Sequence, residues 1–156
     1  MARRSRGSSS IEKSNEKSDE AGDYVLPQHV VVAEDDAVLA MMIEDALHDA
    51  GIAEVEICAS TKDAMRALST RKPKLVIIDV HLADSDDGWA IAELVESMKP
   101  NAPRVIFSTG APQDIPEQIA AMGPVLEKPY DAEELLAVVR QPRRTGLISR
   151  LRRVIR

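Results

Sequence analysis

Hydrophobic and polar positions along the chain follow two alternating periodicities. Short runs of β-favouring apolar residues predict strands at 29–33, 54–59, 75–79, 104–108 and 125–127. Each run is followed by apolar residues spaced as on one face of a helix, within 38–50, 64–68, 91–98, 117–122 and 132–140. Strands that alternate with helices form a parallel sheet covered on both faces. The pattern therefore predicts an α/β fold, doubly wound around a five-stranded parallel sheet.

Helix start and stop signals agree with this pattern. Gly51 follows the first helical stretch, as a glycine commonly does at a helix C-terminus. Ser60 with Asp63 and Asp131 with Glu134 have the spacing of an N-terminal capping pair. We therefore expect helices to begin just after Ser60 and Asp131.

The composition divides the chain into three parts. Residues 1–24 are rich in Ser, Glu, Lys and Asp, which predicts a disordered leader. Residues 25–141 hold the predicted strands and helices and form the expected domain. Residues 142–156 contain six arginines and no acidic residue, although the whole chain has a net charge of −6. The sequence therefore predicts an acidic body with a basic C-terminal tail.

Several classes of protein are disfavoured by the sequence. The single cysteine, Cys58, lies in a predicted strand and allows no disulfide within the chain. No apolar run approaches the length of a membrane span, and the N-terminus lacks the apolar stretch of a signal peptide. Aromatic residues are 3% of the chain, which argues against base-stacking recognition of nucleic acids. A cytoplasmic location is the expectation.

Polar residues follow the ends of four predicted strands, and the carboxyl ends of parallel strands meet at one edge of the sheet. These residues are Glu34, Asp35, Asp36, Asp79, Thr109 and Lys128. Clustered carboxylates require a cation, and an all-oxygen set without Cys or clustered His favours Mg²⁺ over Zn²⁺. A lysine and a hydroxyl beside them complete a phosphoryl site, in which Asp79 is the candidate nucleophile.

From about residue 29 to 140 the chain resembles the receiver domains of two-component response regulators, which have a flavodoxin-like fold. The resemblance rests on the acidic cluster, Asp79 after an apolar strand, Thr109-Gly110 and Lys128-Pro129, in this order and spacing. It implies that Asp79 accepts phosphate from a histidine kinase or a histidine phosphotransferase.

The resemblance also implies a role for each residue around Asp79. Asp35 and Asp79 would ligate Mg²⁺ together with the backbone carbonyl of His81, and Glu34 would support the ion through water. The phosphoryl group would be bound by Thr109 and Lys128.

Two features distinguish this chain from most receivers. Residues 107–110, Phe-Ser-Thr-Gly, resemble the F-A-T-G signature of a subgroup of single-domain regulators from alphaproteobacteria. The interval of 19 residues from Thr109 to Lys128 is also typical of that subgroup. Most receivers carry an aromatic residue three positions before the lysine, but here that position is Val125. We therefore expect the response to phosphorylation in the loop 110–116, not through rotation of an aromatic ring.

Three further residues are candidate modulators of the chemistry: Asp36, His81 and Gly110. His81 lies two positions after the nucleophile, where the resemblance implies control of dephosphorylation. A solvated loop side chain is the alternative for His81. Trp89 begins the third helix and is expected to pack there while partly exposed.

The expected function is that of a stand-alone receiver, because nothing after Arg140 is long enough for an output domain. Such a protein would contact a downstream partner when phosphorylated, or serve as a phosphate shuttle or sink, without turning over an external substrate. A constitutive, unphosphorylated adapter is one alternative. An aspartyl-phosphate phosphatase of the haloacid-dehalogenase type is another, but that family has an acid where this chain has His81.

The apolar residues of the tail lie on one face of a predicted helix. They are Leu147, Ile148, Leu151, Val154 and Ile155. Such a helix could dock on the acidic body, bind a partner or lie on a membrane surface. Nucleic acid is disfavoured because the acidic body would repel phosphate.

Overall fold

The computed structural model of the chain describes residues 25–84 and 89–141. The predictions for the leader 1–24 and the tail 142–156 lie outside these residues. The five described strands are β1 (His29–Ala33), β2 (Glu54–Cys58), β3 (Leu75–Asp79), β4 (Arg104–Thr109) and β5 (Val125–Glu127). The helices are α1 (Ala37–Asp49), α2 (Thr61–Arg71), α3 (Ala90–Ser97), the 3₁₀ turn η1 (Pro112–Asp114), α4 (Glu117–Ala120) and α5 (Ala132–Val139). The predicted alternation of strands and helices is confirmed, with several ends shifted by one or two residues.

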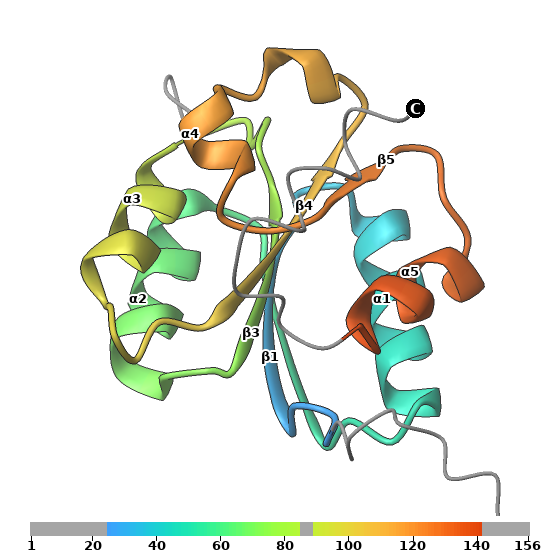
Figure 1. The fold of residues 1–156 in the computed structure, drawn as a ribbon. Helices are drawn as coiled ribbons and strands as arrows, with labels where there is room; N and C mark the ends of the chain where they lie inside the picture. Colours follow the sequence, from blue (N-terminus) through green and yellow to red (C-terminus); the bar gives the residue numbers. More distant parts are fainter. Residues whose placement is uncertain (1–24, 85–88, 142–156) are drawn as a thin grey trace, which may run out of the picture.

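The five strands form one parallel sheet in the order β2-β1-β3-β4-β5. Figure 1 shows α2 and α3 on one face of this sheet and α1 and α5 on the other. The chain therefore has the predicted doubly wound α/β fold. Because all strands run the same way, every strand delivers its last residue to the same edge.

Strand β3 lies at the centre of the sheet, and all of its residues are buried. Val76 and Ile78 contribute to a core against α2 and α3, which we call the α2–α3 core. Leu75 and Ile77 contribute to a second core against α1 and α5, the α1–α5 core. This alternation explains the continuous apolar run in the sequence, because a central parallel strand buries both of its faces.

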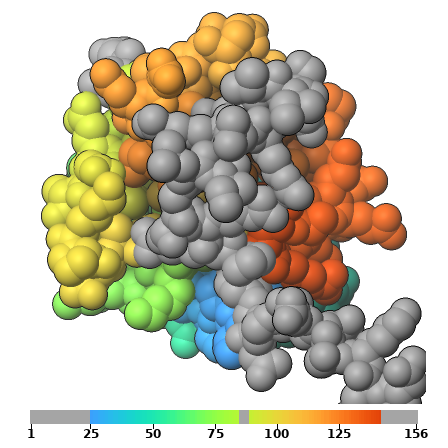
Figure 2. Space-filling view, viewed as in Figure 1, coloured from blue at the N-terminus to red at the C-terminus, as the bar shows by residue number. Residues whose placement is uncertain are grey.

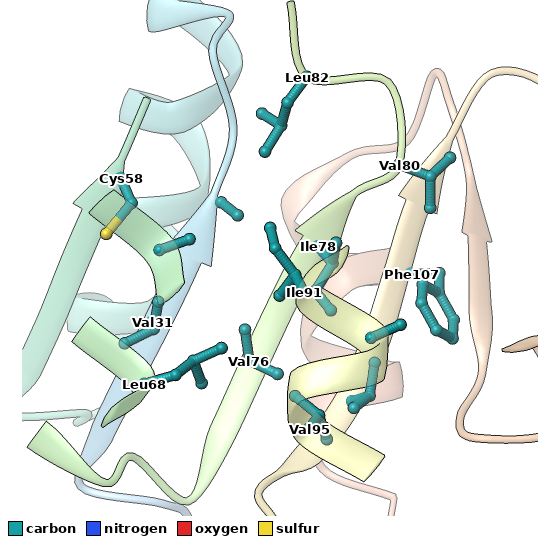
Figure 3. Packing of buried hydrophobic residues seen from close by; sticks show 14 of the residues in the cluster. Val31, Cys58, Leu68, Val76, Ile78, Val80, Leu82, Ile91, Val95 and Phe107 are labelled. Carbon is teal, nitrogen blue, oxygen red and sulfur yellow. The ribbon is translucent and has the colours of Figure 1, made fainter. Parts of the chain in front are cut away.

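The packing of the α2–α3 core is seen in Figure 3. Ile91 and Val95 point from α3 toward the sheet, near Ile78 and Val76. Trp89 is half-buried against this core at the start of α3, as the sequence predicts. Helix packing on this face is thus driven by the burial of branched apolar side chains, each of which stabilises the fold by about 1.5–3 kcal/mol.

The predicted capping residues occupy the helix ends. The hydroxyl of Ser60 accepts the Asp63 N–H at 3.1 Å, and α2 begins at the next residue. Asp131 and Glu134 form a reciprocal capping box at the start of α5. Gly51 follows α1 with a φ of 96°, a conformation that costs glycine little. Local sequence signals therefore fix where these helices begin and end.

The segment between β4 and β5 contains little helix. It consists of the three-residue turn η1 and the four-residue α4, and Figure 1 shows α4 next to α3, on the α2–α3 side of the sheet. Pro112 and Pro116 each lack an N–H and restrict the preceding residue, so a longer helix is not formed here. In the space-filling view of Figure 2 this orange segment forms the upper rim, with α3 in yellow on the left flank and α5 in red on the right.

Among the described residues, no helix combines the length and apolar character needed to cross a membrane.

The turn before β5 depends on a glycine. A Cβ atom on Gly123 would lie 2.0 Å from the backbone oxygen of Val105 in β4, which is closer than any real contact. A Cβ on Gly110 would meet no atom within 4 Å.

We expect Gly123→Ala to lower the free energy of unfolding by about 1–3 kcal/mol in urea titrations, because the β4–β5 pairing has to shift. Gly110→Ala is the matched control and should leave stability within about 0.5 kcal/mol of wild type. Equal stability of the two variants would contradict this account.

Candidate functional site

The predicted polar residues meet at the carboxyl edge of the sheet. Asp79 is the last residue of β3 and Thr109 the last of β4, while Glu34 and Lys128 directly follow β1 and β5. Within β3, Asp79 has the same alternation as Leu75 and Ile77, so its side chain lies on the α1–α5 side. Parallel strand ends therefore bring together residues that are far apart in the sequence.

Lys128 connects two carboxylates of this site. Its Nζ donates to Glu34 Oε2 at 2.9 Å and to Asp79 Oδ2 at 3.1 Å. Burial opposes the charge of this ammonium group, but the two carboxylates outweigh burial and raise the pKa of Lys128. The Lys128 side chain is 25% exposed, so its charge is held at the border between the protein and solvent.

Glu34 is the most deeply buried carboxylate in the cluster, at 2% exposed. Burial raises its pKa and the nearby Asp79 adds to this effect, whereas the Asp36 N–H and Lys128 lower it. One oxygen accepts the Asp36 N–H at 3.0 Å and the other accepts from Lys128. A buried carboxylate of this kind needs its partners, because an unpaired charge in the interior is costly.

Asp79 and Asp35 hold the loop that follows β3. Asp79 Oδ1 accepts the His81 N–H at 2.9 Å, and Asp35 Oδ2 accepts the Ala83 N–H at 3.0 Å. The Asp35 side chain is exposed, whereas Asp79 is buried with 6% of its surface accessible. These two bonds fix the backbone of the loop close to the carboxylates.

The geometry of the carboxylates fits a hard cation. Glu34, Asp35 and Asp79 each offer an oxygen atom, and these atoms lie within 4.8 Å of one another. Oxygen donors at such separations suit Mg²⁺, which prefers carboxylates to nitrogen or sulfur ligands. The fold thus brings together Glu34, Asp35 and Asp79, the three side chains that the sequence analysis predicts around a metal ion.

Thr109 is fully buried at the end of β4. Its hydroxyl oxygen accepts the Ala111 N–H at 3.0 Å, which leaves the hydroxyl hydrogen available for donation. Its carbonyl accepts the Lys128 N–H at 2.8 Å, so the backbone of Lys128 is fastened to β4. Thr109 therefore contacts both the loop after β4 and the residue that carries the ammonium group.

The three candidate modulators lie around the edge of the site. Asp36 caps α1, accepting the N–H groups of Val38 and Leu39 at 2.9 and 3.0 Å. The side chain of His81 is exposed, and Gly110 is exposed next to Thr109. The capping bonds give Asp36 a structural role, and the modulating roles of all three residues stay predictions.

Two polar contacts near the site escaped the sequence analysis. The Tyr130 hydroxyl and the Ser108 Oγ lie 2.8 Å apart, and burial raises the pKa of Tyr130. The Asp84 carboxylate accepts the N–H and the hydroxyl of Thr61 at 2.9 to 3.0 Å, and the N–H bond lowers the pKa of Asp84. The only sequence signal for the first contact is a serine inside the apolar strand β4, which requires a polar partner when buried.

Comparison with known proteins gives one family. The family model described as response regulator receiver domain matches residues 30–140. The transcriptional regulatory protein PdtaR of Mycobacterium tuberculosis (strain ATCC 25618 / H37Rv) is 28% identical over 119 residues, which cover 75% of this chain and 57% of PdtaR. The sensory transduction protein LytT of Bacillus anthracis is 32% identical over 93 residues, which cover 56% of this chain and 37% of LytT. The chain thus spans about half, or less, of the length of these relatives.

Solved structures show the same architecture. PhyR from Bartonella quintana, an anti-anti-sigma factor, is 25% identical with a TM-score of 0.61, covering 76% of this chain and 47% of PhyR. The receiver domain of a response regulator from Bermanella marisrubri is 28% identical with a TM-score of 0.61, covering 70% of this chain and 92% of that domain. A CheY-like receiver domain from Methylobacillus flagellatus has a TM-score of 0.64 at 24% identity, covering 72% of this chain and 95% of that domain, and supports the fold alone.

The charge on Lys128 should be needed for stability as well as for chemistry. Lys128→Met would leave Glu34 and Asp79 without their shared cation, which we expect to lower the free energy of unfolding by about 3 kcal/mol near neutral pH. Loss of the ammonium raises the pKa of Glu34 further, so the folded variant takes up a proton as the pH falls and the penalty shrinks. Urea titrations from about pH 8 down to about pH 5 measure this decrease.

Lys99→Met is the matched control for Lys128→Met. Lys99 pairs with Glu96 on α3, but both side chains are more than half exposed, at 60% and 52%. An exposed pair contributes little, so the control should stay within about 0.5 kcal/mol of wild type at every pH. A penalty at Lys128 that equals the control, or that grows as the pH falls, would refute the proposed charge balance.

Proposed function

Since the chain belongs to the response regulator receiver domain family, we propose that Asp79 accepts a phosphoryl group from a histidine kinase or histidine phosphotransferase. Receiver domains interact with such donors and are in general not enzymes that act on external substrates. The observation that supports this proposal most is the contact of Lys128 with both Asp79 and Glu34 at the carboxyl edge of the sheet. A carboxylate next to a retained positive charge is suited to receive an anionic group.

The transfer would proceed by attack of a carboxylate oxygen of Asp79 on phosphorus. The P–O bond forms as the P–N bond to the donor histidine breaks, and the electron pair leaves with the imidazole. Lys128 would then donate to an oxygen of the phosphoryl group, in place of one of its present bonds to Glu34 or Asp79. Thr109 would donate its hydroxyl hydrogen to another phosphoryl oxygen.

Receiver domains bind Mg²⁺ at an acidic pocket, and the carboxylates of this chain fit such an ion. We propose that Asp35 and Asp79 ligate Mg²⁺ together with the backbone carbonyl of His81, and that Glu34 supports the ion through water. When bound, Mg²⁺ supplies positive charge that neutralises the phosphoryl oxygens. The chain itself contributes the positions of the ligands, which the bonds from His81 and Ala83 hold in place.

We also propose that the loop 110–116 responds to phosphorylation. The Thr109 hydroxyl accepts the Ala111 N–H, so rotation of this hydroxyl toward a phosphoryl oxygen would weaken that bond. Val125 is half-buried and offers no aromatic ring for the alternative route. The short η1 and α4 and residues 107–110 support placement in the subgroup with the F-A-T-G signature, although Ser108 stands where that signature has alanine.

The output proposed for this receiver is phosphorylation-dependent contact with a protein partner, or service as a phosphate shuttle or sink. PhyR of Bartonella quintana is described as an anti-anti-sigma factor, but this chain covers only 47% of PhyR. The arrangement around Lys128 counts against a constitutive adapter, because an adapter has no need for a buried carboxylate held by an ammonium group. His81 in place of a second acid, two positions after Asp79, counts against a haloacid-dehalogenase phosphatase.

Acetyl phosphate labelling tests the proposed acceptor directly. With Mg²⁺, wild type should gain one phosphoryl group by intact-mass spectrometry, whereas Asp79→Asn should gain none. Removal of Mg²⁺ with EDTA should also prevent labelling. In the same samples, amide NMR signals of residues 110–116 should shift on phosphorylation.

Asp84→Asn is the matched control for the acceptor. Asp84 is an exposed carboxylate on the loop after β3, and its oxygens bind Thr61. This variant should be labelled as wild type is. Absence of label on wild type, or label on Asp79→Asn, would overturn the assignment of Asp79.

His81 is proposed to shield the phosphorylated site from water. Its backbone is fixed by the bond to Asp79, while its side chain is exposed two positions after the acceptor. We expect His81→Ala to be labelled normally but to lose phosphate several-fold faster, because water reaches the phosphorus more easily. Decay of isolated phosphoprotein measures this rate, with His48→Ala on α1 as the matched control. An unchanged decay rate would remove His81 from the list of modulators.

A further inference from the structure

The loop that joins β5 to α5 is hydrogen-bonded to the last two residues of β4, Ser108 and Thr109. The Lys128 N–H donates to the Thr109 carbonyl at 2.8 Å. Two positions later, the Tyr130 hydroxyl lies 2.8 Å from the Ser108 Oγ, and either oxygen can be the donor. Lys128 therefore has one attachment to β4 at its own backbone and a second just beyond it.

Ser108 is placed to link this loop to the acceptor. It is 1% exposed, and its backbone is the register partner of Asp79 in β3. In β4 it alternates with Phe107 and Thr109, so its side chain lies on the same side of the sheet as Ile106 and the α1–α5 core. Asp79 lies on that side too, so the Ser108 hydroxyl and the acceptor belong to neighbouring positions of one sheet face.

Tyr130 is anchored at both ends of its side chain. Its ring packs against the α1–α5 core, and its hydroxyl is bonded to Ser108. Ser108 is the register partner of Asp79, so the bond to Ser108 places this hydroxyl close to the site. A rigid ring with two rotatable bonds, held at both ends, leaves the loop little freedom.

We propose that Tyr130, through its hydrogen bond to Ser108, is a positioning residue that holds Lys128 where its ammonium reaches Asp79. This inference rests on the proposed phosphorylation of Asp79 and goes beyond it by assigning a role to two residues outside the acidic cluster. A lysine has a flexible four-carbon stem, so the place of its ammonium depends on how firmly its backbone is held. The aromatic residue that acts on this site is thus located two positions after the lysine, on the α1–α5 side.

The kinetic test uses four variants of the full chain. Tyr130→Phe removes one oxygen and keeps the ring, Ser108→Ala removes the partner, the double variant removes both, and Ser108→Thr keeps a hydroxyl. With acetyl phosphate and Mg²⁺, we expect the two single variants to lower the labelling rate at saturating donor about fivefold, the effect of one hydrogen bond. The donor concentration for half-maximal rate should stay unchanged, because Lys128 positioning affects transfer more than donor capture.

The pattern among the variants separates positioning from general packing. The double variant should be no slower than either single variant, because both lose the same bond, and Ser108→Thr should recover most of the rate. Ser69→Ala is the matched control, since its hydroxyl bonds to Met65 within α2, far from the site. It should react at the wild-type rate. Losses that add in the double variant would overturn the proposal.

A spectroscopic measurement keeps the proposal testable if a variant is poorly folded. The chain has two tyrosines, Tyr24 and Tyr130, so ¹³Cζ-labelled tyrosine gives two NMR signals, assigned with Tyr24→Phe. In the wild-type background, phosphorylation of Asp79 should shift the Tyr130 signal. A Tyr130 signal that does not respond to phosphorylation would overturn the proposal.

The outcomes distinguish this inference from the proposed function beneath it. If wild type takes no label at Asp79, the proposed function fails. If wild type is labelled but Tyr130→Phe and Ser108→Ala are labelled at the wild-type rate, the phosphoacceptor stands and the positioning role of Tyr130 fails.

Discussion

The bridge from Lys128 to Glu34 and Asp79 is the interaction on which the rest of the site depends. Two carboxylates with almost no exposed surface lie next to each other, and their charges are compatible with a folded protein because one ammonium group reaches both. The same positive charge that makes buried Glu34 tolerable is the charge that an incoming phosphoryl group would meet.

The bridge is possible only because of the parallel sheet. Glu34 and Lys128 are separated by 94 residues in sequence, yet they follow strands that end at the same edge. The loops at this edge are then tied to one another by side chains: Asp35 binds the loop after β3, and Ser108 binds the loop after β5. Such cross-loop bonds hold the carboxylates and the lysine in a fixed arrangement at the ends of the strands.

Most of the polar residues around the candidate acceptor Asp79 lie on the α1–α5 side of the sheet. Asp79 and Ser108 project there from neighbouring strands, and Lys128 and Tyr130 complete the group from the loop after β5. Thr109 alternates to the opposite side, where it contacts the loop that leads to η1. A phosphoryl group on Asp79 would therefore act on two routes, one through Thr109 toward residues 110–116 and one through Lys128 and Tyr130 toward α5.

The sequence by itself determined the architecture and predicted which carboxylates come together with Lys128 at the carboxyl edge of the sheet. The apolar run before Asp79 predicted a buried central strand, and capping residues such as Ser60 and Asp131 predicted helix ends, because both kinds of signal depend on periodicity and on hydrogen bonds within a few residues. The convergence of Asp35, Asp79 and Lys128 could be predicted because the carboxyl ends of parallel strands lie at the same edge of a sheet. Only the tertiary structure decided which partner each of these side chains has. That Lys128 binds Glu34 as well as Asp79, and that Ser108 meets Tyr130, depends on the register of neighbouring strands and on loop paths, which no local pattern specifies.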